Sequence, residues 1–272
     1  MSSGVITRTT WLTFGALVVA VLVMFTLITL EVGGETGVMV VADIGETLVV
    51  AASGIVILLC ARRLGWKASV GRSWLLIGLG AFSYAIGDAL WSVIEVGMGQ
   101  EVPYPGITDV FYLLEYPLVA AGILSAGLAF RGLVPLKRAT ITAVVIGASL
   151  SAIVYAAFLV PHVLKVPDLT FGERVLSVAY PVGDIVFMVT PAIFVLGVVA
   201  MLGGGRLGWP WWPVIAGTCL VAMSDTGYAW LTAVDKYASG SVIDYGWSLG
   251  HALVMLGALI ARDLSIPKAH KS

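Results

Sequence analysis

The stretch that decides the fold reads Gly106-Ile-Thr-Asp109-Val-Phe-Tyr112-Leu-Leu-Glu115-Tyr116-Pro117-Leu-Val-Ala-Ala-Gly122. It leads from a loop into an apolar segment, yet its first turns carry two carboxylates and two tyrosines. Asp109, Tyr112 and Tyr116 are spaced i, i+3 and i+7, so they share one face of a helix. The apolar segment predicts a membrane helix, and the acidic and aromatic side chains along one face predict a functional unit.

The same face recurs near the C-terminus as Asp244, Trp247 and His251. Asp184 and Phe187 repeat the first part of the spacing a third time. A pattern that returns in three separate apolar segments indicates that these segments bring similar side chains to a common place.

Composition places the chain in the membrane. Hydrophobic residues make up 59% and charged residues only 11% of the sequence, and the mean hydropathy is +1.00. A soluble domain contains about 25% charged residues. We predict an all-α integral protein of the plasma membrane. The net charge of −1 gives no indication of a nucleic-acid partner, and Cys60 and Cys219 are interpreted as small buried hydrophobes.

Long apolar runs, each near the roughly 20 residues that span a bilayer, predict eight transmembrane helices. They fall at about 11–30, 38–60, 73–96, 109–130, 140–160, 175–201, 213–234 and 244–261. The first is expected to be a retained anchor, because no small-residue cleavage site follows it. The longest polar connection is predicted between Pro161 and Arg174.

Basic residues predict the orientation. With a cytoplasmic N-terminus, 12 of the 15 Lys and Arg lie on the cytoplasmic side, including Arg262, Lys268 and Lys271 of the tail. The exceptions are Lys165, Arg174 and Lys236. Both termini are therefore predicted to be cytoplasmic. The acids are distributed in the opposite way, since every Asp and Glu except Asp263 falls on the outer side or in the outer half of a helix.

Repeated spacings predict an internal duplication. Four pairs of like residues are separated by nearly the same length of chain: Asp43 and Asp184, Asp88 and Asp225, Asp109 and Asp244, and Gly122 and Gly257. They predict a 4+4 tandem, parallel pseudo-repeat with halves at 1–138 and 139–272. The alternative is chance recurrence of Asp at helix starts, where the helix dipole favours it. That alternative explains the acids at helix starts better than those deep inside helices.

Besides Glu95, near the end of the third predicted helix, eight acids fall within the predicted membrane helices: Asp43, Glu46, Asp88, Asp109, Glu115, Asp184, Asp225 and Asp244. No Lys or Arg is predicted at that depth, so shared protons, hydroxyl partners, water or a bound cation must satisfy them. A negative, aromatic-lined cavity suits an organic cation, and would also suit a polar-headed apolar cofactor. The candidate ligand-binding residues are Asp88, Trp91, Asp109, Tyr112, Tyr116, Asp184, Asp225, Tyr228, Asp244, Trp247 and His251. The alternative is an aromatic belt with aspartates that cap their own helices.

No motif assigns a catalytic residue, a cofactor or a metal site. The sequence contains neither His-Glu-x-x-His nor Cys-x-x-Cys. Gly203, Gly205 and Gly208 form a G-x-G-x-x-G between membrane helices, without the βαβ context, and are interpreted as a turn. A hydrogen-bonded core residue is the plainer interpretation of His251, with a ligand contact or proton relay as the alternative.

One hairpin resembles a known class of domain. It comprises Pro103-Tyr-Pro105-Gly-Ile-Thr-Asp109-Val-Phe-Tyr112-Leu-Leu-Glu-Tyr116-Pro117-Leu, preceded by Gly87-Asp88-Ala-Leu-Trp91. The region from Gly87 to Gly122 resembles the membrane-embedded N-terminal regions of prokaryotic diguanylate cyclases, phosphodiesterases and histidine kinases. The resemblance implies a multi-helix sensory or ligand-binding domain. Only a short tail follows the last predicted helix, so output is expected to pass to a separate partner unless the chain is truncated.

The leading prediction is a non-enzymatic membrane sensor or ligand-binding domain with its pocket in the outer half. The alternatives are a cation- or proton-coupled transporter with hinges at Pro117, Pro181 and Pro191, an accessory subunit of a larger membrane complex, and a membrane enzyme acting on lipid or isoprenoid. The expected partners are the lipid bilayer and a cytoplasmic or membrane protein, with an organic cation or a proton as the candidate ligand.

Overall fold

Residues 6–265 of the 272-residue chain are described here in a computed structural model. Every regular element within this range is a helix, as the composition predicted. Lys268, His270 and Lys271 of the predicted basic tail lie outside the described residues.

The helices follow one another as eight long segments. The first four are α1 (Arg8–Thr29), α2 (Gly34–Leu64), α3 (Ser69–Ser92) with the π-helical extension η1 (Val93–Gly97), and α4 (Ile107–Leu128). The fifth is α5 (Leu136–Ile153), which continues as the π-helix η2 (Val154–Leu164). The sixth joins α6 (Phe171–Gly183), the π-helix η3 (Asp184–Val189) and α7 (Thr190–Met201). The short 3-10 helix η4 (Gly205–Gly208) precedes the last two, α8 (Trp211–Ala233) and α9 (Asp244–Ser265).

Seven of these segments in the described chain are long and apolar enough to cross a membrane, and α9 is the exception. α9 is as long as α1, at 22 residues, but it carries Asp244, His251 and Arg262. It packs against α1, α2 and α8, and most of its side chains are buried. Polar side chains in a membrane protein face the bundle interior, so an enclosed helix tolerates them. The whole bundle fits a lipid bilayer.

The connection predicted between Pro161 and Arg174 is shorter than expected. The helix continues through Pro161 to Leu164 as η2, and α6 begins at Phe171. Proline has no amide hydrogen and crowds the preceding turn, which interrupts α-helical hydrogen bonding. The wider π-helical turn accommodates this interruption, so the loop covers only residues 165–170.

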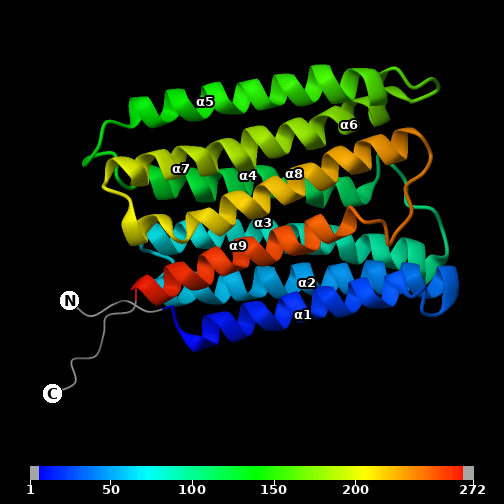
Figure 1. Ribbon diagram of the computed structural model, residues 1–272, viewed down its shortest axis with the longest axis horizontal. Coiled ribbons are helices and arrows are strands. Elements are labelled where there is room, and N and C mark those ends of the chain that lie inside the picture. Colours follow the sequence, from blue (N-terminus) through cyan, green and yellow to red (C-terminus); the bar gives the residue numbers. More distant parts are fainter. Residues whose placement is uncertain (1–5, 266–272) are drawn as a thin grey trace.

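Figure 1 shows the helices side by side along the long axis of the molecule, with α1 and α5 at opposite edges. α2 packs on α3 and α9, α3 packs on α4, and α8 packs on α9. The outer helices α1 and α5 are the least buried of the spans. They expose apolar side chains such as Leu22 and Val145, as expected of surfaces that face lipid.

Two glycines allow neighbouring helices to approach closely. A Cβ atom added at Gly122 on α4 would lie 2.7 Å from the Ser73 carbonyl oxygen on α3. One added at Gly257 on α9 would lie 2.6 Å from the carbonyl oxygen of Pro210, which precedes α8. Small residues of this kind are typical of close helix contacts in membranes, because backbone atoms cannot rotate out of the way.

The two ends of the bundle differ. At one end, here called the terminal end, the Asp263 carboxylate of α9 accepts hydrogen bonds from the Thr7 amide at 2.8 Å and the Thr10 hydroxyl at 2.6 Å. The start of α1 therefore lies beside the end of α9. The opposite end, here called the loop end, carries the connections 30–33, 98–106, 165–170 and 234–243.

Candidate functional site

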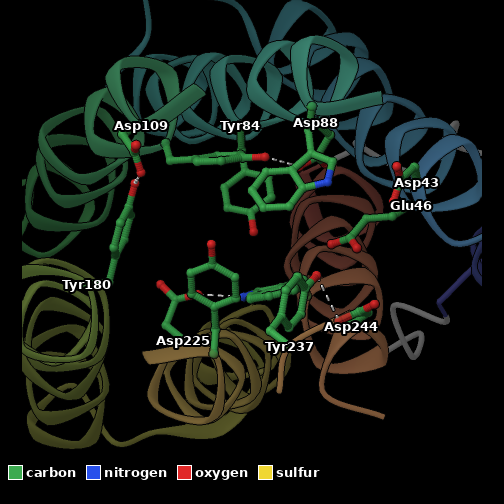
Figure 2. A pocket seen from close by; sticks show the side chains of 13 residues that line it. Asp43, Glu46, Tyr84, Asp88, Asp109, Tyr180, Asp225, Tyr237 and Asp244 are labelled. Atoms are coloured by element: carbon green, nitrogen blue, oxygen red, sulfur yellow. Dashed lines mark hydrogen bonds between the residues drawn. The ribbon is translucent and has the colours of Figure 1, made fainter. Parts of the chain in front are cut away.

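A cavity opens among α2, α3, α4, α6, α8 and α9, and Figure 2 shows its lining side chains. The positions of these residues along their helices place the cavity in the half of the bundle nearer the loop end. The volume of the cavity is about 60 Å³. One buried water needs roughly 10–15 Å³, so the cavity has room for a few waters or a small ligand group. The lining residues are Asp43, Glu46, Tyr84, Asp88, Trp91, Asp109, Tyr112, Tyr180, Asp225, Tyr228, Tyr237, Asp244 and Trp247.

The cavity brings together most of the residues that the helical spacing singled out. Eight of the eleven line it: Asp88, Trp91, Asp109, Tyr112, Asp225, Tyr228, Asp244 and Trp247. The other three, Tyr116, Asp184 and His251, are not among the lining residues. The acidic and aromatic stripes of α3, α4, α8 and α9 therefore face a common space.

Asp88 on α3 and Asp225 on α8 are held in matching ways. The Tyr112 hydroxyl on α4 donates to Asp88 Oδ1 at 3.0 Å, and the Trp247 indole N–H on α9 donates to Asp225 Oδ1 at 2.6 Å. Each carboxylate is 7% exposed. An aromatic donor on the next helix thus fixes each deep acid at the cavity wall.

Asp109 and Asp244 stand at the starts of α4 and α9. Each accepts a bond from a main-chain N–H just before its helix, at 2.6 Å and 2.7 Å respectively. Their other oxygens accept from the hydroxyls of Tyr180 and Tyr237. Burial and the adjacent Asp244 carboxylate raise the pKa of the loop residue Tyr237 well above its ordinary value, so this phenol keeps its proton. Asp109 therefore bonds the N-cap amide of α4, Asp244 bonds an amide of the loop before α9, and both acids also line the cavity.

α2 supplies two further carboxylates, which the sequence counted among the membrane acids but not in the site. Asp43 Oδ2 and Glu46 Oε1 are buried, and neither has a hydrogen-bond partner within residues 6–265. Asp88 Oδ2 is likewise buried and has no hydrogen-bond partner among the described residues. The predicted duplication pairs Asp43 with Asp184, and this pairing could have identified Asp43 as a site residue. A buried polar atom without a partner is costly, so each of these three oxygens requires a proton, a water or a bound cation.

Aromatic rings complete the wall. Tyr84 lies against Tyr112, with ring centroids 4.6 Å apart. Tyr228 meets Tyr237 edge-on at 4.7 Å and Trp247 at 5.8 Å. Tyr237 escaped sequence analysis because it lies in the 234–243 loop, where helical spacing carries no information. The rings offer several π faces to a bound group.

Tyr116 and Asp184 lie behind the cavity wall. The Tyr116 hydroxyl is 3.0 Å from Asp184 Oδ1 and 3.4 Å from Asp225 Oδ2. Asp184 is thereby connected to the cavity through Tyr116 and Asp225.

His251 makes the contacts of a core residue. Its Nε2 lies 3.2 Å from Glu115 Oε1, and its Nδ1 lies 2.9 Å from the Trp247 carbonyl oxygen. The Tyr84 ring lies 4.7 Å from the imidazole. Both ring nitrogens are therefore engaged away from the cavity.

The cavity is lined by carboxyl groups and by no Lys, Arg or His among the lining residues. Six carboxyl groups line the cavity (Asp43, Glu46, Asp88, Asp109, Asp225 and Asp244). In the described part of the chain, Arg262 forms an ion pair with Asp263 and His251 is hydrogen-bonded to Glu115, and neither pair includes a cavity acid. Figure 2 shows Asp88 and Asp109 across the space from Asp225. Among the residues described, no group of three or more His, Cys, Asp or Glu is placed to hold a metal ion.

Comparison of the chain with protein-family models, with curated proteins and with solved structures found no match. The arrangement of the site itself is therefore the basis for the functional argument.

Proposed function

We propose that the protein is a membrane sensor that binds a small organic cation in the acidic, aromatic cavity and signals to a separate partner protein. The observation that carries the proposal is that three carboxylate oxygens of the cavity lining, on Asp43, Glu46 and Asp88, are buried and have no hydrogen-bond partner among the described residues. An ammonium group offers positive charge and hydrogen-bond donors, which are what these oxygens lack. The surrounding π faces add cation–π attraction.

The size of the cavity limits the ligand. At about 60 Å³, it suits an ammonium group with short substituents. A longer ligand would leave its remaining atoms toward the loop end. Binding would draw α2 and α3 toward α8 and α9, and this change in helix packing is the signal that a partner would detect.

The orientation is part of the proposal. Ten of the thirteen described Lys and Arg lie toward the terminal end, and the positive-inside rule assigns such an end to the cytoplasm. The cavity would then take its ligand from outside the cell, and the partner would dock at the cytoplasmic side. The region from Gly87 to Gly122 resembles membrane-embedded sensory regions of signalling proteins. This resemblance supports the same orientation, with the partner on the cytoplasmic side.

We further propose that the cavity lies between two four-helix repeats, 1–138 and 139–272. Trp74 and Trp211 are separated along the chain by the same interval as Asp88 and Asp225. Their rings stack at 5.5 Å with an interplanar angle of 14°. A residue touches its own counterpart only near the axis that relates two copies, so this contact supports a two-fold axis along the bundle.

The donor pairs at the cavity support the same relation. The bond from Tyr112 to Asp88 and the bond from Trp247 to Asp225 join positions that correspond under the repeat spacing. The close approaches at Gly122 and Gly257 also correspond. A duplicated ancestor would explain why both halves bring an acid and an aromatic donor to one space.

The test is a binding titration of the purified full chain in lipid nanodiscs. Methylammonium and tetramethylammonium serve as probes, with sodium and potassium as comparators, and binding is followed by calorimetry and tryptophan fluorescence. We expect saturable binding of an organic ammonium. Asp88→Asn removes one negative charge at nearly constant volume and should weaken binding at least about tenfold, since a charge-assisted contact contributes about 1.5–3 kcal/mol.

Glu35→Gln is the matched control. Glu35 is an exposed acid in the first turn of α2, outside the cavity, so its substitution makes the same charge change without touching the site. Absence of saturable binding by either ammonium probe would overturn the proposal. Equal weakening by Asp88→Asn and Glu35→Gln would also overturn it, because the cavity acid would then contribute only bulk charge.

A cation- or proton-coupled transporter is the second candidate. The sixth segment changes from α-helix to π-helix at Asp184, between Pro181 and Pro191. Such an interruption can shift the turn that carries Asp184 without breaking the whole helix. Methylammonium-dependent flux into proteoliposomes under a proton gradient would favour the transporter, and binding without flux would favour the sensor.

A further inference from the structure

A second buried acidic group lies directly behind the cavity. Asp184 on η3 is 0% exposed, Tyr116 on α4 is 6% exposed and Asp225 on α8 is 7% exposed. The Tyr116 hydroxyl lies between the two carboxyl groups, at 3.0 Å and 3.4 Å, and is 3.1 Å from the Tyr180 carbonyl oxygen. Of Asp184, Tyr116 and Asp225, only Asp225 also lines the cavity.

These contacts require one proton more than the tyrosine can supply. A phenol has a single O–H, and carbonyl and ionised carboxylate oxygens only accept. If both aspartates were ionised, the Tyr116 hydroxyl could satisfy one of its three neighbours and would oppose its lone pairs to the other two. The Tyr180 carbonyl oxygen already accepts the Asp184 main-chain N–H, so one added proton is enough for the two carboxyl groups: a protonated Asp184 donates to the Tyr116 oxygen, and Tyr116 donates onward to Asp225.

The surroundings decide which aspartate holds that proton. Asp225 Oδ1 receives the Trp247 indole N–H at 2.6 Å, which stabilises a carboxylate. Asp184 Oδ2 is buried and has no partner in the described chain. An ionised Asp184 would have only the Tyr116 hydroxyl as a side-chain donor in the described chain and no solvent, so its ionised form is the more costly of the two and the proton belongs on Asp184.

No nearby cation offsets this requirement within the described chain. Glu115 on α4 is paired with His251 of α9, and the Tyr180 hydroxyl on α6 is bound to Asp109. Of the other elements packed on η3, α7 contains no titratable residue, and the cations of α5 are Lys137 and Arg138 in its first turn, at the terminal end.

We propose that Asp184 and Asp225 share one proton through Tyr116, and that a cation entering the cavity beside Asp225 releases this proton. The release of this proton by a cation rests on the proposed function. One positive charge enters and one leaves, so the buried charge is unchanged. The O–H bond of Asp184 breaks as the proton passes to Tyr116, the Tyr116 proton passes to Asp225, and Asp225 gives its proton to water in the cavity.

The shared proton is tested without any ligand, by infrared spectroscopy of the full chain in nanodiscs. We expect a carbonyl stretch from a protonated carboxylic acid that shifts in deuterated buffer. Asp184→Asn should remove this band, Tyr116→Phe should shift it because it loses its hydrogen-bond partner, and Glu35→Gln should leave it in place. An unchanged carboxylic-acid spectrum in Asp184→Asn overturns the assignment.

The release is tested by calorimetric titration with methylammonium in two buffers of different ionisation enthalpy. The wild-type chain should release about one proton per cation bound, as charge balance requires, and Asp184→Asn should bind without release. Binding by the wild type without proton release overturns the coupling and leaves the proposed function intact. No binding, with the infrared band present, overturns the proposed function and the coupling while the shared proton stands.

Discussion

Tyr112→Phe is the most direct test of the hydrogen bonding at the cavity, because it removes one oxygen and leaves the ring. The ring has little freedom to move. It lies 4.6 Å from the Tyr84 ring, and a Cβ added at the neighbouring Gly87 would be only 2.5 Å from Tyr112 Cε1. Any effect on stability therefore reports the lost hydroxyl and not a repacked core.

The expected loss follows from the position of Asp88. Its Oδ1 accepts the Tyr112 hydroxyl at 3.0 Å, and its Oδ2 has no partner in residues 6–265. Tyr112→Phe thus removes the hydrogen bond that the Asp88 carboxylate receives from the described residues. A hydrogen bond to a charged group contributes about 1.5–3 kcal/mol and one to a neutral group about 0.5–1.5 kcal/mol. We expect the free energy of unfolding to fall by about 2–3 kcal/mol if Asp88 is ionised.

The assay is unfolding in mixed micelles with increasing sodium dodecyl sulfate, followed by tryptophan fluorescence. Tyr155→Phe is the control, because Tyr155 lies on η2 with 44% of its surface exposed. A double-mutant cycle with Asp88→Asn isolates the pairwise interaction. In the Asp88→Asn background, Tyr112→Phe should lower the free energy of unfolding by about 1 kcal/mol less than it does in the wild type.

A loss below about 0.5 kcal/mol, within the range of ordinary surface substitutions, would refute the reasoning. So would an equal loss with and without the Asp88 carboxylate. Either result would mean that the tyrosine hydroxyl does not stabilise the acid.

Two other predictions concern packing and the chain ends. Gly122→Ala and Gly257→Ala should each lower the free energy of unfolding by about 1–3 kcal/mol, since the added methyl group meets a backbone oxygen at 2.7 Å or 2.6 Å; Gly15→Ala on α1 meets nothing within 4 Å and should be neutral or stabilising by up to about 1 kcal/mol. Losses of similar size at all three positions, in the same unfolding assay, would contradict the packing argument. Asp263→Ala removes the bonds from Thr7 and Thr10 and should speed amide hydrogen exchange at the start of α1 while leaving ammonium binding unchanged. Unaltered exchange there would show that these bonds do not hold α1 to α9.

The eight helical segments follow from local properties of the sequence. Apolar runs and turn residues located each segment, and the i, i+3, i+7 spacing placed Asp109 and Tyr112 on one face. The departures occur where local rules are weakest. Helix η2 runs through Pro161, where proline was expected near a helix end, because a π-helical turn absorbs the missing amide hydrogen.

Only part of the candidate site could be predicted from the sequence. Spacing within one helix identifies which residues share a face, but it does not fix how that helix is rotated against its neighbours. For this reason the deep acids could be named, and the repeat spacing pointed to Asp43, while the inclusion of Glu46 and the withdrawal of Asp184 from the cavity wall could not be predicted. Tyr237, in a loop, had no periodicity to reveal it.

The sequence by itself determined a multi-helix membrane protein with carboxylates and aromatic rings in the half that lies toward the loop end. Hydropathy and helical period are properties of consecutive residues, so they need no knowledge of the rest of the chain. The tertiary structure decided which oxygens of the described residues remain without partners and that one tyrosine, Tyr116, stands between Asp184 and Asp225. Those relations join residues from helices far apart in the sequence, and only the packing of the helices against one another sets the distances between them.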